Sequence, residues 1–413
     1  MDEEESGRTD GPRLHVGLVH WSFPPCVGGV ETHLWDYSRL LAGHGVDVTV
    51  FTGTPDPAIP RHAGIRVLYH SGLDLSPAPR TPPGEPTLTD WFRKELSPDP
   101  ARGRAGARLV HGHNLHHFSD GPARALGGLR QELNLRLHHT YHSVWREGSV
   151  NPAAEACRNW DRHYAVSDFL RRECVRRIGI VPERRYLGVD TKTYQEVPVS
   201  GGRQVPGRVL LPARLIPNKG ARLAVRAVEH IINNRTTSVK PHLVLTDTKN
   251  TVDFHHEKDG FREELQKLIA KLEIERHVDF VEARVDEMRE LYEAASVVIY
   301  PSVFDEPMGL APLEAMCAAR PVVVTRMGGL DEGVEYDGEI GYLVPDRSVD
   351  KLADRIALLI DSPEHAQQVG IRAREHVMAH FDLERHYVLP MIKEYRAQLA
   401  EDPGADAGGT SPL

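Results

Sequence analysis

The chain has few cysteines and no long apolar run. Its 413 residues contain four cysteines and no CxxC pair, which excludes a disulfide scaffold and predicts small buried thiols in a reducing compartment. No apolar stretch approaches the roughly 18 residues that a membrane span needs. The first residues, MDEEESGRTDGPR, are acidic and polar, unlike a secretory signal. These features predict a cytoplasmic protein without stable membrane insertion.

The chain also lacks an excess of positive charge. Fifty Lys and Arg residues stand against 59 Asp and Glu residues, so the formal net charge is −9 at pH 7. Proteins that bind nucleic acid regardless of its sequence carry a basic surface that neutralises phosphates. We therefore expect no nucleic-acid partner.

The length and the apolar pattern predict two domains of one fold class. A chain of 413 residues exceeds what one hydrophobic core usually organises. Short apolar runs alternate with helical segments in two series, which is typical of parallel sheets with crossover helices. The runs lie at 14–20, 46–53, 65–70, 108–114, 135–142 and 163–167, then at 209–214, 242–247, 278–283, 297–302 and 321–325. The predicted fold is α/β, with two doubly wound Rossmann-like domains that face each other across a cleft.

The domain boundaries follow from turn-forming residues. Proline and glycine in QEVPVSGGRQVPG indicate a linker. We predict an N-terminal domain over 14–195, a linker over 196–207 and a C-terminal domain over 208–380. Residues 381–400 are expected to form a helix that packs back toward the N-terminal domain, and residues 1–13 and 401–413 to form disordered tails.

Residues 71–106 interrupt the pattern of the first domain with seven prolines. Proline at this density neither continues a helix nor sits in a central strand. We predict a long irregular loop with at most one short helix, around Leu88 to Leu96. Long loops in compact domains often bind ligands.

The sharpest chemical signal is FDEPMGLAPLEAM at 304–316. Two carboxylates, Glu306 and Glu314, flank a turn formed by Met308, Gly309 and Leu310 that is expected to open a helix. A helix N-terminus binds anions, and the carboxylates can accept hydrogen bonds from hydroxyl groups on either side of that anion. A nucleotide sugar offers these groups in this order. The alternative is a structural helix whose acidic residues only complement its dipole.

Further motifs place cations and glycines at strand ends. PARLIPNKG at 212–220 puts Arg214 and Lys219 after a strand, where both can hold a diphosphate. A solvated surface pair is the alternative for these two. Gly28 and Gly29 form an early strand-to-helix turn, and TRMGGLDEG at 325–333 holds a later Gly-Gly pair that permits close backbone approach.

These motifs, in this order and spacing, resemble glycosyltransferase family 4, a large family of retaining enzymes with the GT-B fold. The resemblance covers roughly residues 14 to 400. It implies that Glu306 contacts the transferred sugar, that Glu314 holds the ribose, and that Arg214 and Lys219 bind the diphosphate. It also implies that Gly28, Gly29, Met308, Gly309 and Leu310 belong to the donor site and that His142 lies near the reacting carbon. The turn after the strand at 242–247 departs from the family, because it lacks the usual glycine.

Histidine is abundant, with 23 residues, and HGHNLHH at 111–117 and HHTYH at 138–142 invite a metal assignment. Metal ligation needs three or four convergent ligands with an oriented outer shell. We expect no metal and no cofactor here, because histidines at the strand ends of a phosphate-binding cleft need none. His138 and His139 are expected to be packing residues.

The sequence thus predicts a retaining glycosyltransferase. Its expected partners are a nucleoside-diphosphate sugar and a small soluble acceptor, in a biosynthetic pathway such as that of a natural product, and the loop at 71–106 is expected to help shape acceptor binding. Two alternatives stay open: a glycoside phosphorylase of the same fold, and a non-catalytic sugar or nucleotide sensor. The sequence also does not decide the nucleotide base, the sugar or the acceptor, or whether the protein forms a homodimer.

Overall fold

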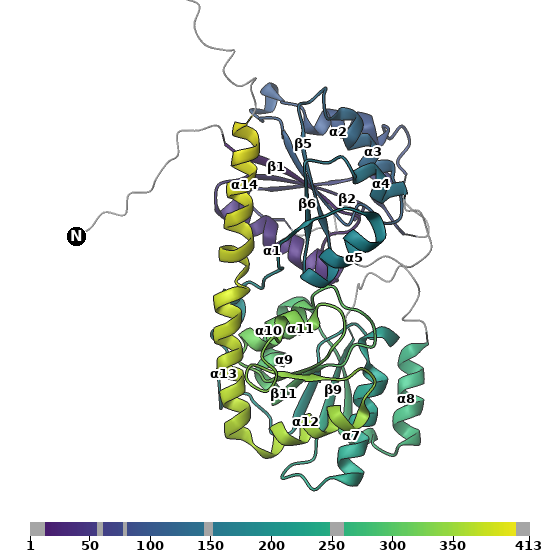
Figure 1. Cartoon of the computed structure of the whole chain (residues 1–413). Coiled ribbons are helices and arrows are strands. Elements are labelled where there is room, and N and C mark those ends of the chain that lie inside the picture. Colours follow the sequence, from purple (N-terminus) through teal and green to yellow (C-terminus); the bar gives the residue numbers. More distant parts are fainter. Residues whose placement is uncertain (1–12, 56–60, 77–80, 144–151, 248–259, 402–413) are drawn as a thin grey trace, which may run out of the picture.

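The computed structural model describes residues 13–55, 61–76, 81–143, 152–247 and 260–401. It contains two parallel sheets, each covered by helices on both faces. Figure 1 shows the sheets one above the other, with the C-terminal helices running along one side of both. The predicted α/β class with two Rossmann-like sheets is therefore confirmed.

The first sheet has seven parallel strands in the order β3-β2-β1-β4-β5-β6-β7. Six of them fall within the predicted runs to within one residue, whereas the two-residue β7 was not predicted, because both of its residues are exposed and form no apolar run. The strands are β1 (His15–Val19), β2 (Asp47–Thr52), β3 (Ile65–Tyr69), β4 (Leu109–His113), β5 (Arg136–Tyr141), β6 (Arg162–Ala165) and β7 (Glu183–Arg184).

The second sheet has six parallel strands in the order β10-β9-β8-β11-β12-β13. Strand β13 is buried but only three residues long, too short to be recognised as an apolar run. The strands are β8 (Arg208–Leu211), β9 (His242–Asp247), β10 (Val278–Glu282), β11 (Val297–Tyr300), β12 (Val322–Thr325) and β13 (Tyr342–Val344).

Helices cover both faces of each sheet, because alternate residues of a buried strand point to opposite sides. In β8, Leu210 packs into one core, while Val209 and Leu211 pack into the other. The helices of the first half are α1 (Gly29–Gly43), α2 (Leu88–Leu96), α3 (Gly121–Leu129), α4 (Pro152–Cys157), α5 (Asp168–Ile178) and α6 (Thr191–Tyr194). Those of the second half are α7 (Ala221–Asn234), α8 (Phe261–Lys271), α9 (Met288–Ala294), α10 (Leu310–Cys317), α11 (Leu330–Gly333), α12 (Val349–Asp361), α13 (Pro363–His380) and α14 (Leu389–Ala400).

The last helix lies against the first sheet. A π-helical turn at Glu384–Val388 joins α13, beside the second sheet, to α14, which continues along the first (Figure 1). The Tyr395 hydroxyl in α14 shares a 2.7 Å hydrogen bond with the Tyr37 hydroxyl in α1. Glu394 accepts a 2.8 Å hydrogen bond from Arg162 in β6. The C-terminal helices α13 and α14 therefore link the second half of the chain to the first.

The proline-rich segment contains the short helix predicted at Leu88 to Leu96, which is α2. The helix has a structural task that the sequence did not reveal: Trp91 and Phe92 stack edge-on against Phe51 of β2, with ring centroids 5.2 and 5.3 Å apart. None of the described residues of this segment lines the cavity between the sheets. A role in acceptor binding stays a prediction, and residues 77–80 lie outside the described residues.

The four cysteines are free thiols. Three of them are buried as expected, whereas Cys26 is only half-buried, because it lies in the loop between β1 and α1 instead of in a core.

Candidate active site

A cavity of about 330 Å³ lies between the two sheets, at the carboxyl ends of their strands. This is where open α/β sheets bind ligands, since their loops and helix N-termini converge there. All ten residues that the sequence singled out line this cavity: Gly28, Gly29, His142, Arg214, Lys219, Glu306, Met308, Gly309, Leu310 and Glu314. The fold therefore brings together motifs that lie as much as 286 residues apart (28 to 314).

Two helices begin at the cavity, one from each half of the chain. Gly28 is the N-cap of α1 and Gly309 the N-cap of α10, and neither glycine supplies a side-chain cap, although the buried carboxylate of Glu31 lies at the first turn of α1. Gly309 has a φ of 89°, and a Cβ there would stand 2.6 Å from a methyl carbon of Leu330. The backbone N–H groups and dipole of α10 give the cavity a positive end suited to an anion, whereas the Glu31 carboxylate offsets the positive end of α1.

A buried ion pair lies beside the start of α10. The Lys219 ammonium, which follows β8, donates a 2.6 Å hydrogen bond to Oε1 of Glu306. The Ser302 hydroxyl donates to the same oxygen at 2.9 Å. Burial is the largest single influence and lowers the pKa of Lys219, but Glu306 and Tyr300 together raise it, so the net pKa lies above its usual value. The lysine therefore stays charged inside the cavity.

The later Gly-Gly pair supports the loop that carries Glu306. Gly329 donates its N–H to the carbonyl oxygen of Glu306 at 2.7 Å. Gly328 has a φ of 68°, and a Cβ there would lie 2.2 Å from that same oxygen. Only glycine allows this approach, so the pair fixes the position of the loop.

Glu332, in the same motif, joins the two halves. Its carboxylate accepts hydrogen bonds from the backbone N–H groups of Asp168 and Phe169, at 2.7 and 2.6 Å. These groups open α5 in the first half, so a negative charge lies at that helix N-terminus. The sequence indicated the Gly-Gly turn but not its contact with the start of α5, because 164 residues separate Glu332 from Asp168.

Glu314 lies in the first turns of α10 and is partly accessible from the cavity. Burial raises the pKa of its carboxyl to about 7, although the hydrogen bond from the Tyr292 hydroxyl, at 2.7 Å, lowers it in part. The carboxyl is therefore close to half-ionised at neutral pH. Neither the hydroxyl partner nor the raised pKa could be predicted from the sequence.

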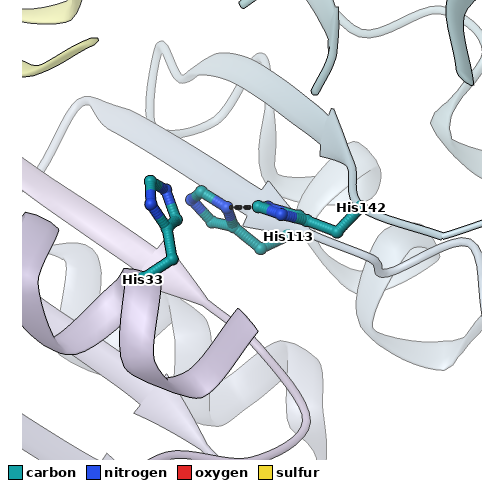
Figure 2. A group of neighbouring side chains, drawn as sticks. All are labelled: His33, His113 and His142. Carbon is teal, nitrogen blue, oxygen red and sulfur yellow. Dashed lines mark hydrogen bonds between the residues drawn. The ribbon is translucent and has the colours of Figure 1, made fainter. Parts of the chain in front are cut away.

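His142 directly follows β5 and lines the cavity. Its backbone N–H donates to Oδ1 of Asn114 at 2.7 Å, and its Nε2 shares a 2.8 Å hydrogen bond with Nδ1 of His113 (Figure 2). Burial and the neighbouring histidines hold the pKa of His142 well below its usual value, so the imidazole is neutral at pH 7.

Two further histidines gather beside His142 that the sequence did not assign to the site. His113 ends β4, and His33 lies in the second turn of α1 (Figure 2). The sequence could have pointed to them through their positions, because His113 stands at the end of a strand and His33 near the start of a helix. His138 and His139 lie inside the sheet and are fully buried, as expected of packing residues.

Comparison with known proteins is consistent with this geometry. Residues 27–193 match the family described as "Glycosyltransferase Family 4", and residues 200–376 match "Glycosyl transferases group 1". The two matches contain every candidate site residue and every strand of both sheets except β1.

The chain belongs to glycosyltransferase family 4.

Relatives span nearly the full length of this glycosyltransferase. It is 25% identical over 411 residues to a D-inositol 3-phosphate glycosyltransferase of Kribbella flavida, covering 90% of this chain and 93% of the relative. A sucrose-phosphate synthase structure from Thermosynechococcus elongatus has a TM-score of 0.73 and 23% identity, covering 94% of this chain and all of that one. HepE from Anabaena, solved with UDP and glucose, has a TM-score of 0.69 at 18% identity, covering 94% and 100%. The glycosyltransferase thus has the GT-B fold.

None of the helices described for this glycosyltransferase combines the length and the apolar character that crossing a bilayer requires.

Proposed function

We propose that the enzyme transfers a glycosyl group, with retention at the anomeric carbon, from a nucleoside-diphosphate sugar to a small soluble acceptor. The observation that carries this proposal is the composition of the cavity. The N-terminus of α10, a buried lysine and an arginine line it together with two carboxylates. A diphosphate with hydroxyl groups on both sides fits this arrangement.

The donor lies mainly against the second half of the chain. The diphosphate binds at the start of α10, with Arg214 and Lys219 beside it. Glu314 accepts a hydrogen bond from the ribose. The described residues donate two hydrogen bonds to the Glu306 carboxylate and both go to Oε1, so Oε2 is the oxygen that accepts from a hydroxyl of the transferred sugar. The HepE structure, which contains UDP and glucose, supports a donor of this class.

Retention follows from attack on the same face as the leaving group. The transition state resembles an oxocarbenium ion, and negative charge builds on the departing diphosphate. Fixed positive groups stabilise that charge most when they are already in place, so Arg214, Lys219 and the start of α10 act chiefly there. Because Lys219 and Ser302 hold Glu306, we assign this carboxylate to binding and not to nucleophilic attack.

The neutral imidazole of His142 orients the sugar. It comes from the first half of the chain and faces the donor across the cavity. The first half also holds the acceptor. The curated relative that acts on D-inositol 3-phosphate supports an acceptor of small size. In this mechanism the cations and helix dipoles neutralise the diphosphate, so no metal ion is essential.

A binding screen followed by a turnover assay tests the proposal. Thermal shifts across nucleoside diphosphates and their sugars identify the base, because a ligand that binds the native state raises the unfolding temperature. Release of nucleoside diphosphate is then measured with candidate acceptors. Arg214→Ala should lower kcat roughly tenfold or more. The control is Arg222→Ala, a surface residue paired with Glu264, which should leave kcat unchanged. Cleavage of a glycoside that requires inorganic phosphate and no nucleotide would point to the phosphorylase instead.

A further inference from the structure

Three buried histidines, His33, His113 and His142, form a group that we call the histidine trio. Each offers one ring nitrogen, and these nitrogens all lie within 4.8 Å of one another. The three come from α1, β4 and the end of β5, so three rigid elements fix their positions (Figure 2). Their exposed fractions are 1%, 0% and 5%.

Several nitrogens of the trio have no hydrogen-bond partner among the described residues. Both ring nitrogens of His33, Nε2 of His113 and Nδ1 of His142 are buried and unpaired. Buried polar atoms normally have a partner, so these nitrogens require one. His113 and His142 share a hydrogen bond between Nδ1 and Nε2, and this bond must open before each of the three rings can turn a lone pair toward one ion.

We propose that the histidine trio binds a divalent late transition-metal ion, with Zn²⁺ as its type, and that this ion inhibits the enzyme. Three imidazoles suit Zn²⁺, whereas Mg²⁺ and Ca²⁺ require oxygen ligands. Zn–N bonds of about 2.1 Å in a tetrahedral site place the nitrogens about 3.4 Å apart. Side chains that now lie within 4.8 Å reach that spacing through small ring movements.

Inhibition follows from the position of His142, and this part rests on the proposed function. Of the trio, only His142 lines the cavity. A metal ion that takes a ring nitrogen of His142 turns the imidazole away from the transferred sugar. Three protein ligands also leave one coordination position for water or an anion, which places a divalent charge beside the donor. The metal is thus an inhibitor and not a cofactor.

Metal binding is tested on the whole enzyme after chelation and dialysis. Equilibrium dialysis against Zn²⁺ should show one ion bound per chain at this site. His33→Gln should weaken that binding at least tenfold. The control is His138→Gln, since His138 is equally buried and also has an unpaired ring nitrogen but does not belong to the trio. Absence of this ion from the wild type, or equal binding by His33→Gln, overturns the site.

Co²⁺ gives a second readout that needs no variant. Bound by the trio in wild-type enzyme, it should produce the visible absorption of a tetrahedral site, and Zn²⁺ should remove it. If His33→Gln fails to fold, absence of this absorption in the wild type overturns the proposal.

Assays of donor turnover test whether Zn²⁺ bound at the histidine trio inhibits the enzyme. One equivalent of Zn²⁺ should lower wild-type turnover at least tenfold, chelator should restore it, and His33→Gln should resist. Wild-type enzyme that binds Zn²⁺ and keeps full turnover overturns the inhibition. An enzyme that transfers from no nucleotide sugar even without Zn²⁺ refutes the proposed function instead, and the dialysis result still decides the metal site.

Discussion

Glu314 should make donor affinity depend on pH. Burial raises the pKa of its carboxyl to about 7, and we propose that the ionised form accepts a hydrogen bond from the ribose. The carboxyl is about 10% ionised at pH 6 and about 90% at pH 8. Because a neutral side chain should bind roughly 5- to 30-fold more weakly, the dissociation constant should fall about three- to eightfold as pH rises between them. Affinity should rise with pH because the ionised carboxylate, the form that binds the ribose, becomes more abundant.

Glu314→Gln removes the charge but keeps an acceptor oxygen. Loss of a charge-assisted hydrogen bond should weaken binding at pH 8 by about 1 to 2 kcal/mol, or roughly 5- to 30-fold. At pH 6 the difference should nearly vanish, because the wild-type carboxyl is then mostly protonated.

Calorimetry with an intact nucleotide sugar is the suitable assay. Its diphosphate is esterified at both ends and takes up no proton in this range, unlike a free nucleoside diphosphate. Burial holds the pKa of His142 well below this range, so that group does not interfere. Glu264→Gln, at an exposed residue, is the control. A wild-type affinity that is constant from pH 6 to 8, or an unchanged slope in Glu314→Gln, would refute the assignment.

The remaining predictions concern catalysis. Lys219→Ala should lower kcat roughly tenfold or more, as should Arg214→Ala, with circular dichroism showing an intact fold; normal turnover in both would disprove the donor site. His142→Ala should lower kcat about 10- to 1000-fold with a much smaller loss of nucleotide affinity, and a larger loss in His138→Ala would show that the strand end is misplaced. Chelation and dialysis should leave full activity, and a loss that one divalent ion restores would mean that a metal is essential.

The fold and the residues that line the cavity could largely be predicted from the sequence, because both depend on local patterns. The short runs read as buried strands correspond to eleven of the thirteen strands described, whereas the exposed β7 and the three-residue β13 gave no such signal. The motifs stand at strand ends, and parallel strands bring their ends to one edge of the sheet.

Contacts between distant segments could not be predicted. The Lys219–Glu306 pair joins residues 87 positions apart, and nothing in either motif indicates that they touch. His33 looked like one polar residue of an amphipathic helix, and only the packing of α1 on the sheet places it beside His113 and His142. The raised pKa of Glu314 depends on burial, which a helical pattern alone does not give.

The stereochemistry of the transfer tests the central claim most directly. Purified enzyme is incubated with the nucleotide sugar identified by the screen and with an acceptor, and proton NMR of the first product determines its anomeric configuration. We predict acceptor-dependent release of nucleoside diphosphate and a glycoside with the same anomeric configuration as the donor. A product of inverted configuration, or a glycosyl transfer that needs no nucleotide sugar, would contradict the account.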